Sequence, residues 1–504
     1  MTEVSATLQS VLAGHAMRQP AAPLALAPET GDVLTYRALA DQTDRLSAFL
    51  HYRGIERGAT IALHLHNGTQ TAALFLGLMC AGYVVAPLNL LSQRGQLAAV
   101  IAHSGARLVF SCAAHRAQLA EAISELNDPP DTHEIDIDAL RLFEEFEPSR
   151  HAPVHRVTTG DTALLMYTSG TTGMPKGVLL SHANLLSAAR AVASWHSLTA
   201  NDRVLSSLPL YHINGQVIAT LAPFVSGGSI VAPHRFSATQ WWDLVEQFRC
   251  TWINMVPTII AYLLNTPETR KFPGLRFGRS ASAPLPPEQH KAFEARFGVP
   301  VIEAMGMTEC ASTVFCNPHD DRRRYGSPGL PCGVEAGVID EAGRHLRAHE
   351  TGELVLRGPN VMTGYFKASD LTAKAIDADG WLRTGDLGFR DADGFYFVTG
   401  RLKELIIKGG ENIAPREIDE VLLRHPAILE ASAFAIADAN YGQEIAAAVI
   451  LKPDAFFDPA EISAFCVREL GKYKTPSRWH VVTDLPKGPS GKVQRLKLPD
   501  ILGA

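Results

Sequence analysis

Thr168-Ser-Gly-Thr-Thr-Gly-Met-Pro-Lys-Gly177 carries more information about this protein than any other stretch of the chain. It directly follows an apolar run at 163–167 that reads as a buried strand. Its three glycines let the backbone bend and bring amide N–H groups close to an anion. The stretch therefore predicts a cradle for a polyphosphate. Its predicted contacts are Thr168, Ser169, Gly170, Thr171, Thr172 and Lys176.

This stretch differs from the P-loop of common nucleotidases. That motif requires the pattern G-x-x-x-x-G-K-[ST]. Here Gly170 and Gly173 are spaced differently, and Gly177 follows the lysine where a hydroxyl should hold Mg²⁺. An ordinary polar turn is a weak alternative, because ten consecutive residues would have to match a phosphate cradle by accident.

The segments around the cradle alternate between strand and helix. A short β-like run at 60–64 precedes a helical stretch at 69–80, and a second β-like run follows at 83–87. Such alternation predicts an α/β architecture with largely parallel sheets. The other predicted buried strands are 163–167, 251–256 and 299–304.

A smaller unit is predicted at the C-terminal end. Short strands with Gly-rich turns around 354–357 and 395–398 indicate an antiparallel layer, and glycine and charge then cluster at 401–412. A helix beginning at Pro415, a strand at 430–436 and a helix at 459–470 complete a unit of about 100 residues, which is a normal domain size. The predicted domains are 1–400 and 401–504, with the boundary near Gly400–Lys403.

Composition excludes several classes of protein. The chain of 504 residues is 46% hydrophobic and 19% charged with a net charge of −6, so it lacks the basic surface of a nucleic-acid-binding protein. Its seven scattered cysteines include no C-x-x-C pair, which fits a reducing compartment and argues against disulfides or structural zinc. The longest apolar run, 72–88, contains glycine and proline and is too short to span a membrane. We expect a soluble cytoplasmic protein that binds neither nucleic acid nor membrane.

The cradle resembles the phosphate loop of the adenylate-forming (ANL) superfamily, which includes acyl-CoA synthetases, and further motifs extend the resemblance in order along nearly the whole chain. The resemblance implies a large N-terminal domain of stacked αβ subdomains with a β-barrel-like layer, and a small mobile α+β C-terminal domain. It also implies ATP, Mg²⁺ and coenzyme A as the bound small molecules.

Met305-Gly-Met-Thr-Glu309 is similar to the family's Y-G-x-T-E motif. In that motif the threonine, here Thr308, contacts the α-phosphate, and the glutamate, here Glu309, holds Mg²⁺. A carboxylate beside a phosphate cradle suits a hard cation, and the hydroxyl of Thr168 is a second expected metal contact. Met305 replaces the tyrosine that usually stacks on adenine, although a thioether can still lie against a ring. Gly306 is expected at the nucleotide.

Two further segments resemble nucleotide-binding motifs. Ser280-Ala-Ser-Ala-Pro-Leu285 is similar to the family's adenine-side segment, with Ser282, Ala283 and Pro284 as expected contacts. Thr384-Gly-Asp386 matches the segment whose aspartate takes the ribose hydroxyls, and Arg401 resembles its partner. A structural ion pair between Asp386 and Arg401 is the alternative.

The C-terminal motifs imply a moving domain. Lys403 lies where the family has its interdomain hinge, and Gly409, Gly410 and Glu411 resemble the loop that faces coenzyme A. Lys492 resembles the catalytic lysine that contacts the acid and the α-phosphate. Rotation about the hinge would exchange these two sets of groups at one site.

The resemblance implies an AMP-forming acid–CoA ligase. The acid carboxylate attacks the α-phosphate of ATP, pyrophosphate leaves, and the thiol of coenzyme A then displaces AMP. Leu210-Tyr-His-Ile-Asn-Gly-Gln216 resembles the acyl-pocket segment, with His212 catalytic at the junction of the acyl and CoA channels. The expected pocket residues are His212, Asn214, Arg279, Ser280 and Ser312.

Polar pocket residues favour a short acid with a second polar or anionic group, such as sulfoacetate, malonate or oxalate, because an alkyl tail would leave buried donors unpaired. Several motifs most resemble oxalate–CoA ligases, but that pattern carries histidines where this chain has Asn214 and Ser312, which argues against oxalate itself. A small aliphatic or aryl acid remains an alternative if these groups bond to backbone.

Other enzyme classes also remain open. An amino-acid-activating domain that loads a carrier protein is the nearest of them, and a kinase or a non-catalytic nucleotide-binding protein are more distant. The sequence supports no particular oligomeric state, a homodimer included.

Overall fold

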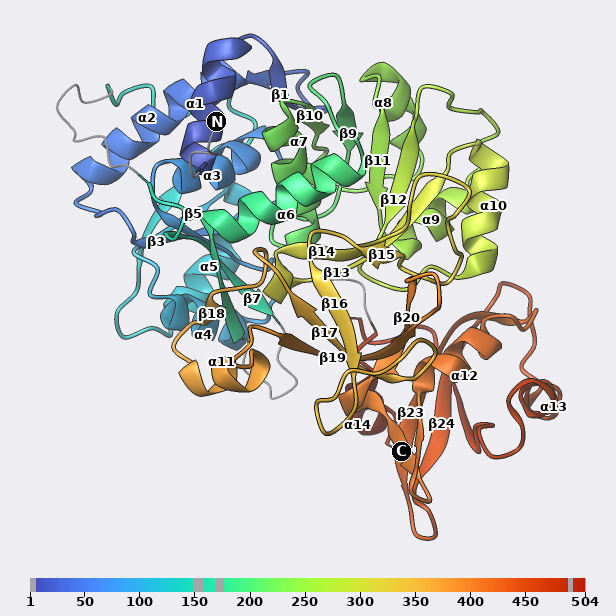
Figure 1. Ribbon diagram of the computed structural model, residues 1–504. Helices are drawn as coiled ribbons and strands as arrows, with labels where there is room; N and C mark the ends of the chain where they lie inside the picture. The colour runs from blue at the N-terminus through green and yellow to red at the C-terminus, as the bar shows by residue number, and fades with distance from the viewer. Residues whose placement is uncertain (1–5, 148–156, 169–175, 488–492, 504) are drawn as a thin grey trace. The chain divides into compact units, whose positions relative to one another are not determined.

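The computed structural model divides into two compact units, each with its own sheets and its own core (Figure 1). The first unit comprises the chain up to Tyr325 with the segments 329–335 and 357–380, and the second comprises the rest. No helix among the described residues is long and apolar enough to cross a membrane. The structure describes residues 6–147, 157–168, 176–487 and 493–503.

The first unit contains a seven-stranded, mostly parallel sheet. Across the sheet its strands are β18 (Gly364–Tyr365), β8 (Lys176–Ser181), β7 (Thr162–Thr168), β4 (Val84–Pro87), β3 (Thr60–His64), β5 (Leu108–Ser111) and β6 (Asp131–Glu134). β7, β4, β3, β5 and β6 run parallel, whereas β8 is antiparallel to both of its neighbours. The predicted strands at 60–64, 83–87 and 163–167 are therefore confirmed.

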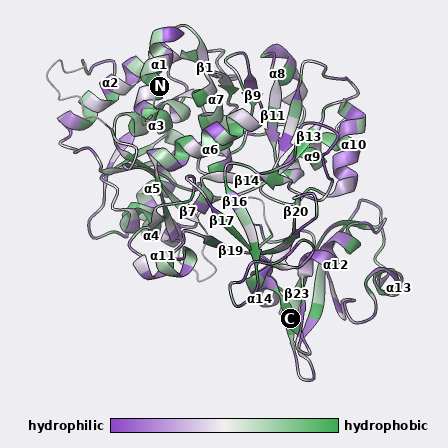
Figure 2. Cartoon of the chain, in the orientation of Figure 1, coloured by the Kyte–Doolittle hydropathy of each residue, from purple (hydrophilic) through white to green (hydrophobic). Residues whose placement is uncertain are grey.

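Helix α3 (Thr69–Cys80) has the predicted bounds and is buried along its whole length. It is hydrophobic all round, as expected for a helix enclosed on every side, whereas α10 (Pro287–Phe297) is mostly hydrophilic (Figure 2). The other helices of the first unit are α1 (Leu8–Arg18), α2 (Tyr36–Tyr52), α4 (Arg94–Ser104), α5 (Arg116–Ile123), α6 (His182–Trp195), α7 (Ala222–Ser226), α8 (Trp241–Gln247), α9 (Pro257–Leu264) and α11 (Ser369–Ala375).

A nine-stranded sheet completes the first unit. Across the sheet its strands are β15 (Leu330–Pro331), β14 (Ser312–Cys316), β13 (Val301–Met307), β12 (Phe277–Ser280), β11 (Trp252–Met255), β9 (Arg203–Leu205), β10 (Ser229–Val231), β1 (Pro23–Leu26) and β2 (Val33–Thr35). The strands from β13 to β1 are parallel, and β14, β15 and β2 add antiparallel edges. Helices α8, α9 and α10 supply much of the core on one face, around Trp241, Ile260 and Phe293.

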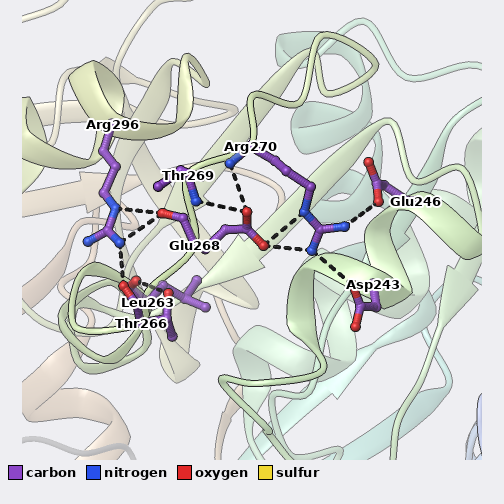
Figure 3. A network of polar contacts seen from close by, with 8 residues as sticks. All are labelled: Asp243, Glu246, Leu263, Thr266, Glu268, Thr269, Arg270 and Arg296. Carbon is purple, nitrogen blue, oxygen red and sulfur yellow. Dashed lines mark hydrogen bonds and ion pairs between the residues drawn. The ribbon is translucent and has the colours of Figure 1, made fainter.

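The connection between α9 and β12 is held by a polar network (Figure 3). Arg270 forms ion pairs with Glu268 and with Asp243 and Glu246 of α8, at 2.6, 2.8 and 2.6 Å. Arg296 of α10 donates a hydrogen bond to the backbone oxygen of Glu268. Exposed ion pairs contribute little stability one by one, so the network mainly fixes the path of this connection.

The second unit has two sheets. The smaller has the order β16 (Glu335–Ile339), β17 (Gly352–Arg357), β19 (Leu382–Arg390) and β20 (Tyr396–Arg401). The larger comprises β22 (Glu411–Ile413), β21 (Ile406–Lys408), β24 (Gly442–Leu451), β23 (Ile428–Asp438) and β25 (Arg478–Val481). Its helices are α12 (Pro415–Leu422), α13 (Pro459–Leu470) and α14 (Leu498–Leu502).

Antiparallel pairing of β17 with β19 and of β19 with β20 confirms the predicted antiparallel layer. α12 begins at Pro415 as expected, because proline fits the first helical turn. Its Ile418 and Leu422 pack into a core with Ile445 and Ile462.

Candidate active site

The two ends of the predicted phosphate cradle lie side by side. Thr168 ends β7, Lys176 begins β8, and the two residues face each other in the antiparallel register. The predicted contacts Ser169, Gly170, Thr171 and Thr172 lie outside the described residues. The fold thus places Thr168 and Lys176 next to each other where β7 ends and β8 begins.

Tyr365 connects this hairpin to the predicted metal ligand. Its strand β18 pairs with β8, and the Lys176 Nζ lies 5.0 Å from the centre of its ring, within cation–π range. The Tyr365 hydroxyl donates a 3.0 Å hydrogen bond to Oε1 of Glu309. Burial, with the nearby Glu309 charge, raises the pKa of Tyr365, so its hydroxyl stays protonated and remains a donor.

The backbone around Glu309 has an unusual conformation. Glu309 lies in the 3-10 helix η3 (Thr308–Cys310) at the end of β13, and Ala311 and Ser312 follow with φ of 50° and 103°. Non-glycine residues with positive φ are strained and cluster at functional sites. The Met362 N–H anchors the segment by a 2.7 Å bond to the backbone oxygen of Glu309.

Gly306 is required by a close approach of two strands. A Cβ atom at this position would lie 2.2 Å from the backbone oxygen of Ser312, because β13 and β14 are tightly paired there. The glycine of the Met305–Glu309 motif therefore allows Ser312, a predicted pocket residue, to lie against the nucleotide motif. The side chain of Met305 is half-buried, next to it on β13.

The predicted adenine-side segment leaves the sheet at the same edge. Ser280 ends β12 and pairs with Glu303 of β13, so residues 282–284, which follow β12, and residues 305–309, at the carboxyl end of β13, belong to neighbouring parallel strands. Ligands of α/β sheets characteristically bind at this edge. Ser282 also has positive φ, at 76°. The fold brings the two nucleotide motifs of the first unit together.

A chain of side-chain amides lies behind Ser282. The Asn214 Nδ2 donates to the Ser282 hydroxyl at 3.1 Å, and the Asn254 Nδ2 donates to the Asn214 Oδ1 at 3.0 Å. Asn214 is buried and begins the π-helix η2 (Asn214–Leu221), an uncommon conformation that is frequent at functional sites. Half-buried His212 lies two residues before this helix begins, and its Nδ1 accepts a 3.5 Å hydrogen bond from the backbone N–H of Asn214.

Arg279 supplies a buried positive charge near this chain. It pairs with Asn254 in the parallel register, so both side chains point to the same face of the sheet. Its Nη2 donates a 2.6 Å hydrogen bond to Thr313, while its Nε and Nη1 form no hydrogen bond with a described residue. Within the described part of the chain no carboxylate forms an ion pair with Arg279, and burial lowers its pKa.

The ribose residues predicted in the second unit pair with each other. Asp386 of β19 and Arg401 of β20 are register partners, and the Arg401 Nε lies 2.7 Å from the Asp386 Oδ1. Asp386 is buried, and its Oδ2 accepts no hydrogen bond from a described residue. The pair fits the structural alternative, and the second oxygen still offers an acceptor.

The other predicted residues of the second unit are exposed, or lie outside the described part. Lys403 lies in the short 3-10 helix η4 (Leu402–Glu404). Gly409 and Gly410, with φ of 55° and 88°, form the two-residue turn of the β21–β22 hairpin, which needs glycine, and Glu411 follows. Lys492 lies outside the described residues.

Three residues of this site are not among those predicted from the sequence: Tyr365, Asn254 and Thr313. Tyr365 belongs to a strand of two residues far along the chain from both of its partners. Asn254 lies in the buried strand β11, whose sequence resembles that of oxalate–CoA ligases without marking this side chain as a site residue. Only tertiary pairing brings them to the site, and no local pattern indicates them.

Comparison with known proteins gives consistent matches over the whole chain. Residues 12–366 match the family model of the AMP-binding enzyme, and residues 417–492 match that of the AMP-binding enzyme C-terminal domain. The sulfoacetate–CoA ligase of Cupriavidus necator is 51% identical over 502 residues, with 98% of each chain covered. The oxalate–CoA ligase of Arabidopsis thaliana is 36% identical over 476 residues, with 92% of each chain covered.

Solved structures of other proteins share the fold of this chain. The ATP-bound crystal structure of MatB from Rhodopseudomonas palustris superposes with a TM-score of 0.91 at 29% identity, covering 99% of this chain and 100% of that one. The o-succinylbenzoate CoA synthetase MenE from Bacillus subtilis, in complex with ATP and magnesium ion, gives a TM-score of 0.87 at 29% identity, covering 97% and 99%. The expected α/β fold with a large N-terminal and a small C-terminal domain is confirmed by this agreement.

Proposed function

The chain belongs to the AMP-binding enzyme family and is an acid–CoA ligase, and from this premise we propose that the acid it activates is sulfoacetate. The observation that carries the proposal is the buried guanidinium of Arg279, which pairs with no carboxylate among the described residues and whose register partner Asn254 begins the Asn254–Asn214–Ser282 chain. A pocket built in this way favours an acid with a second negative charge.

Desolvation supports an anionic acid over an apolar one. A buried donor left without a partner costs about 1–3 kcal/mol, and a buried charge costs more. The Nε and Nη1 atoms of buried Arg279 have no hydrogen-bond partner among the described residues, and an alkyl chain could not provide one, whereas a sulfonate offers three acceptor oxygens. The sulfoacetate–CoA ligase of Cupriavidus necator, 51% identical to this chain, acts on such an acid.

Oxalate is the second candidate, since an oxalate–CoA ligase is 36% identical to this chain. Asn214 and Ser312 stand where the oxalate pattern carries histidines. Oxalate is also shorter, because its two carboxylates are directly bonded, so a charge that recognises its second carboxylate must lie nearer to the reacting one. Because the identity is lower and the two histidines are absent, we propose sulfoacetate rather than oxalate as the substrate.

For the first half-reaction we propose that Lys176 and the cradle hydroxyls hold the β- and γ-phosphates, and that Thr308 contacts the α-phosphate. A carboxylate oxygen of the acid attacks the α-phosphorus, the bond from that phosphorus to the bridging oxygen breaks, and pyrophosphate leaves. Mg²⁺, when bound, neutralises phosphate charge. The carboxylate of Glu309, oriented by the Tyr365 hydroxyl, together with Thr168 would hold it, and both offer the oxygen ligands that this ion prefers.

For the second half-reaction the sulfur of coenzyme A attacks the acyl carbon, the bond to AMP breaks, and the thiol proton passes to solvent. We keep Asp386 and Arg401 as ribose contacts, Lys492 as the group acting in adenylation only, and Gly409–Glu411 as the loop at coenzyme A. The two family models match 12–366 and 417–492, and Lys403 lies in the interval between them. We keep domains of 1–400 and 401–504 with a hinge at Lys403 as a proposal, whereas the compact second unit of the structure also includes residues 336–356 and 381–400.

The experiment is a competition between acids of one shape. Pyrophosphate release and CoA thioester formation are measured with sulfoacetate, oxalate, malonate and 3,3-dimethylbutyrate, whose tert-butyl group replaces the sulfonate without charge. We expect the highest kcat/KM for sulfoacetate and little turnover of 3,3-dimethylbutyrate. A preference for 3,3-dimethylbutyrate would refute an anionic pocket. A preference for oxalate would keep the anionic pocket and replace the substrate.

A further inference from the structure

Three potential metal ligands converge in the first unit, outside the proposed active site. His66 follows β3 in the connection to α3, Cys112 follows β5, and His115 ends the 3-10 helix η1 (Ala113–His115). Because β3 and β5 are parallel neighbours, both connections leave the same edge of the sheet. One ligand atom from each of the three residues lies within 4.8 Å of the other two.

The distances between these atoms match a tetrahedral metal. The His66 Nδ1 lies 3.3 Å from the His115 Nε2, and the Cys112 Sγ lies 3.6 Å from the same Nδ1. With metal–nitrogen bonds of about 2.0 Å and metal–sulfur bonds of about 2.3 Å, tetrahedral angles place two nitrogens about 3.3 Å apart and nitrogen and sulfur about 3.5 Å apart. A network of hydrogen bonds explains these distances less well, because a single ring nitrogen, the His66 Nδ1, lies close to both the His115 Nε2 and the Cys112 Sγ.

The surroundings suit a cation. The ring of His234 lies 5.1 Å from that of His66, and its Nε2 is 2.9 Å from the carboxylate of Asp138, with Glu29 at 3.9 Å from its Nδ1. These two carboxylates bring negative charge close to the three ligands.

A buried imidazole borders the cluster as well. His64, the last residue of β3, is fully buried, and its ring lies 5.3 Å from that of His115. Neither of its ring nitrogens forms a hydrogen bond with a described residue. Burying such a polar ring is costly unless it gains a partner, for example a metal-bound water.

We propose that His66, Cys112 and His115 form a binding site for Zn²⁺, with a fourth position open to water. Neutral imidazole and thiolate are the ligands this ion prefers, and Cys112 is buried while both histidines are half-buried, which leaves a path for entry. The absence of a C-x-x-C pair argues against zinc in the sequence, but that pattern cannot detect ligands from two separate connections.

The metal would crosslink the two connections. The next residue after His66 is Asn67, whose side chain donates to the Leu208 backbone oxygen and accepts from the Leu210 N–H, both at 3.0 Å. The site would thus stiffen the base of the segment that leads to His212. A ligand that binds only the folded state raises the unfolding temperature.

The test is a Co²⁺ and Zn²⁺ titration of the tag-free full chain after dialysis against a chelator. We expect one equivalent of Co²⁺ to produce a sulfur-to-cobalt charge-transfer band and tetrahedral d–d bands, and Zn²⁺ to displace it. Cys112→Ser should lose the charge-transfer band and bind Zn²⁺ at least about tenfold more weakly. The matched controls, Cys466→Ser in the second unit and His51→Ala on the exposed end of α2, should bind like the wild type.

Zn²⁺ should also raise the thermal unfolding midpoint of the wild type and of both controls, but not of Cys112→Ser. If Cys112→Ser does not fold, X-ray absorption of the zinc-loaded wild type decides: one sulfur at about 2.3 Å with nitrogen or oxygen at about 2.0 Å supports the site. A wild type without the charge-transfer band, or a zinc shell without sulfur, overturns the proposal.

Discussion

The Tyr365 hydroxyl donates a 3.0 Å hydrogen bond to Oε1 of Glu309, so a residue outside every recognisable motif orients the carboxylate expected to hold Mg²⁺. The same ring lies 5.0 Å from Lys176 Nζ. One side chain therefore connects the phosphate hairpin to the metal ligand, two parts of the site that lie far apart in the sequence.

Tyr365→Phe removes the hydroxyl and keeps the ring beside Lys176. Since a hydrogen bond to a charged group contributes about 1.5–3 kcal/mol, we expect kcat/KM for Mg·ATP to fall by roughly ten- to a hundredfold, with a higher Mg²⁺ requirement. Steady-state pyrophosphate release over a Mg²⁺ series measures both. Tyr52→Phe, at an exposed tyrosine of α2, is the control and should be silent. An unchanged Mg²⁺ requirement in Tyr365→Phe would show that the hydroxyl does not serve the metal ligand.

Gly306→Ala tests the close approach of β13 and β14. The added Cβ would lie 2.2 Å from the Ser312 backbone oxygen, which no side-chain rotation can relieve, so the strands must separate. We expect the free energy of unfolding to fall by about 3 kcal/mol, as for overpacked cores, and adenylation to be lost. Urea unfolding and pyrophosphate release measure the two effects.

Gly95→Ala is the matched control for this substitution. Gly95 lies in the first turn of α4, and a Cβ there would meet nothing within 4 Å. Alanine should leave stability unchanged or raise it slightly. If both variants behave alike, the tight strand contact is not what requires glycine at position 306.

Much of this architecture is predictable from sequence, because it depends on local periodicity. α3 has its predicted bounds, since the mostly apolar stretch Thr69–Cys80 is flanked by Gly68 and Gly82. β3 likewise coincides with the β-like run predicted at 60–64. In such segments the same hydrophobic pattern determines both which residues are buried and which helix or strand they form.

Side chains that act through tertiary contacts are not predictable in this way. Tyr365, Asn254 and Cys112 have neighbours in the sequence that say nothing about their partners. Arg279 was expected in the acyl pocket, yet its burial and its bond to Thr313 depend on how β12 and β14 lie across β13. These contacts therefore depend on the order of the strands in the sheet, which cannot be read from a single sequence.

His182 makes stability depend on pH. It begins α6, is fully buried, and its Nδ1 accepts a 3.4 Å hydrogen bond from the Leu8 N–H. Burial lowers the pKa of His182 from 6.5 to about 4. Because the unfolded chain binds this proton more tightly, its contribution to stability is complete above pH 6.5 and is lost as the pH falls toward 4.

Between pH 7 and pH 5 the wild type should lose about 2 kcal/mol of unfolding free energy through this group alone. His182→Gln cannot titrate, so its unfolding free energy should decrease less over the same interval, by that difference. Urea unfolding at the two pH values measures it, with His51→Gln on the exposed end of α2 as the control. Equal pH dependence in the wild type and in His182→Gln would contradict the assignment.

Arg279→Met tests whether the buried charge selects the acid. Methionine fills a similar volume without charge, and the amide chain Asn254–Asn214–Ser282 involves no atom of Arg279. A charge about 6 Å away at an effective dielectric constant of about 20 contributes roughly 3 kcal/mol, which is about a hundredfold in rate. We expect kcat/KM for sulfoacetate to fall by about that factor, while the low value for 3,3-dimethylbutyrate stays the same or rises.

The ratio of kcat/KM for sulfoacetate to kcat/KM for 3,3-dimethylbutyrate distinguishes an electrostatic role of Arg279 from a structural one. If Arg279 only supports the strand through Thr313, both acids lose turnover equally and the ratio does not change. If its charge recognises the sulfonate, only the charged acid is affected and KM for ATP is preserved. Arg322→Met, at a side chain that is 71% exposed, removes one charge from the surface and should leave the ratio unchanged. A hundredfold loss confined to sulfoacetate would therefore identify Arg279 as the residue that reads the second charge of the acid.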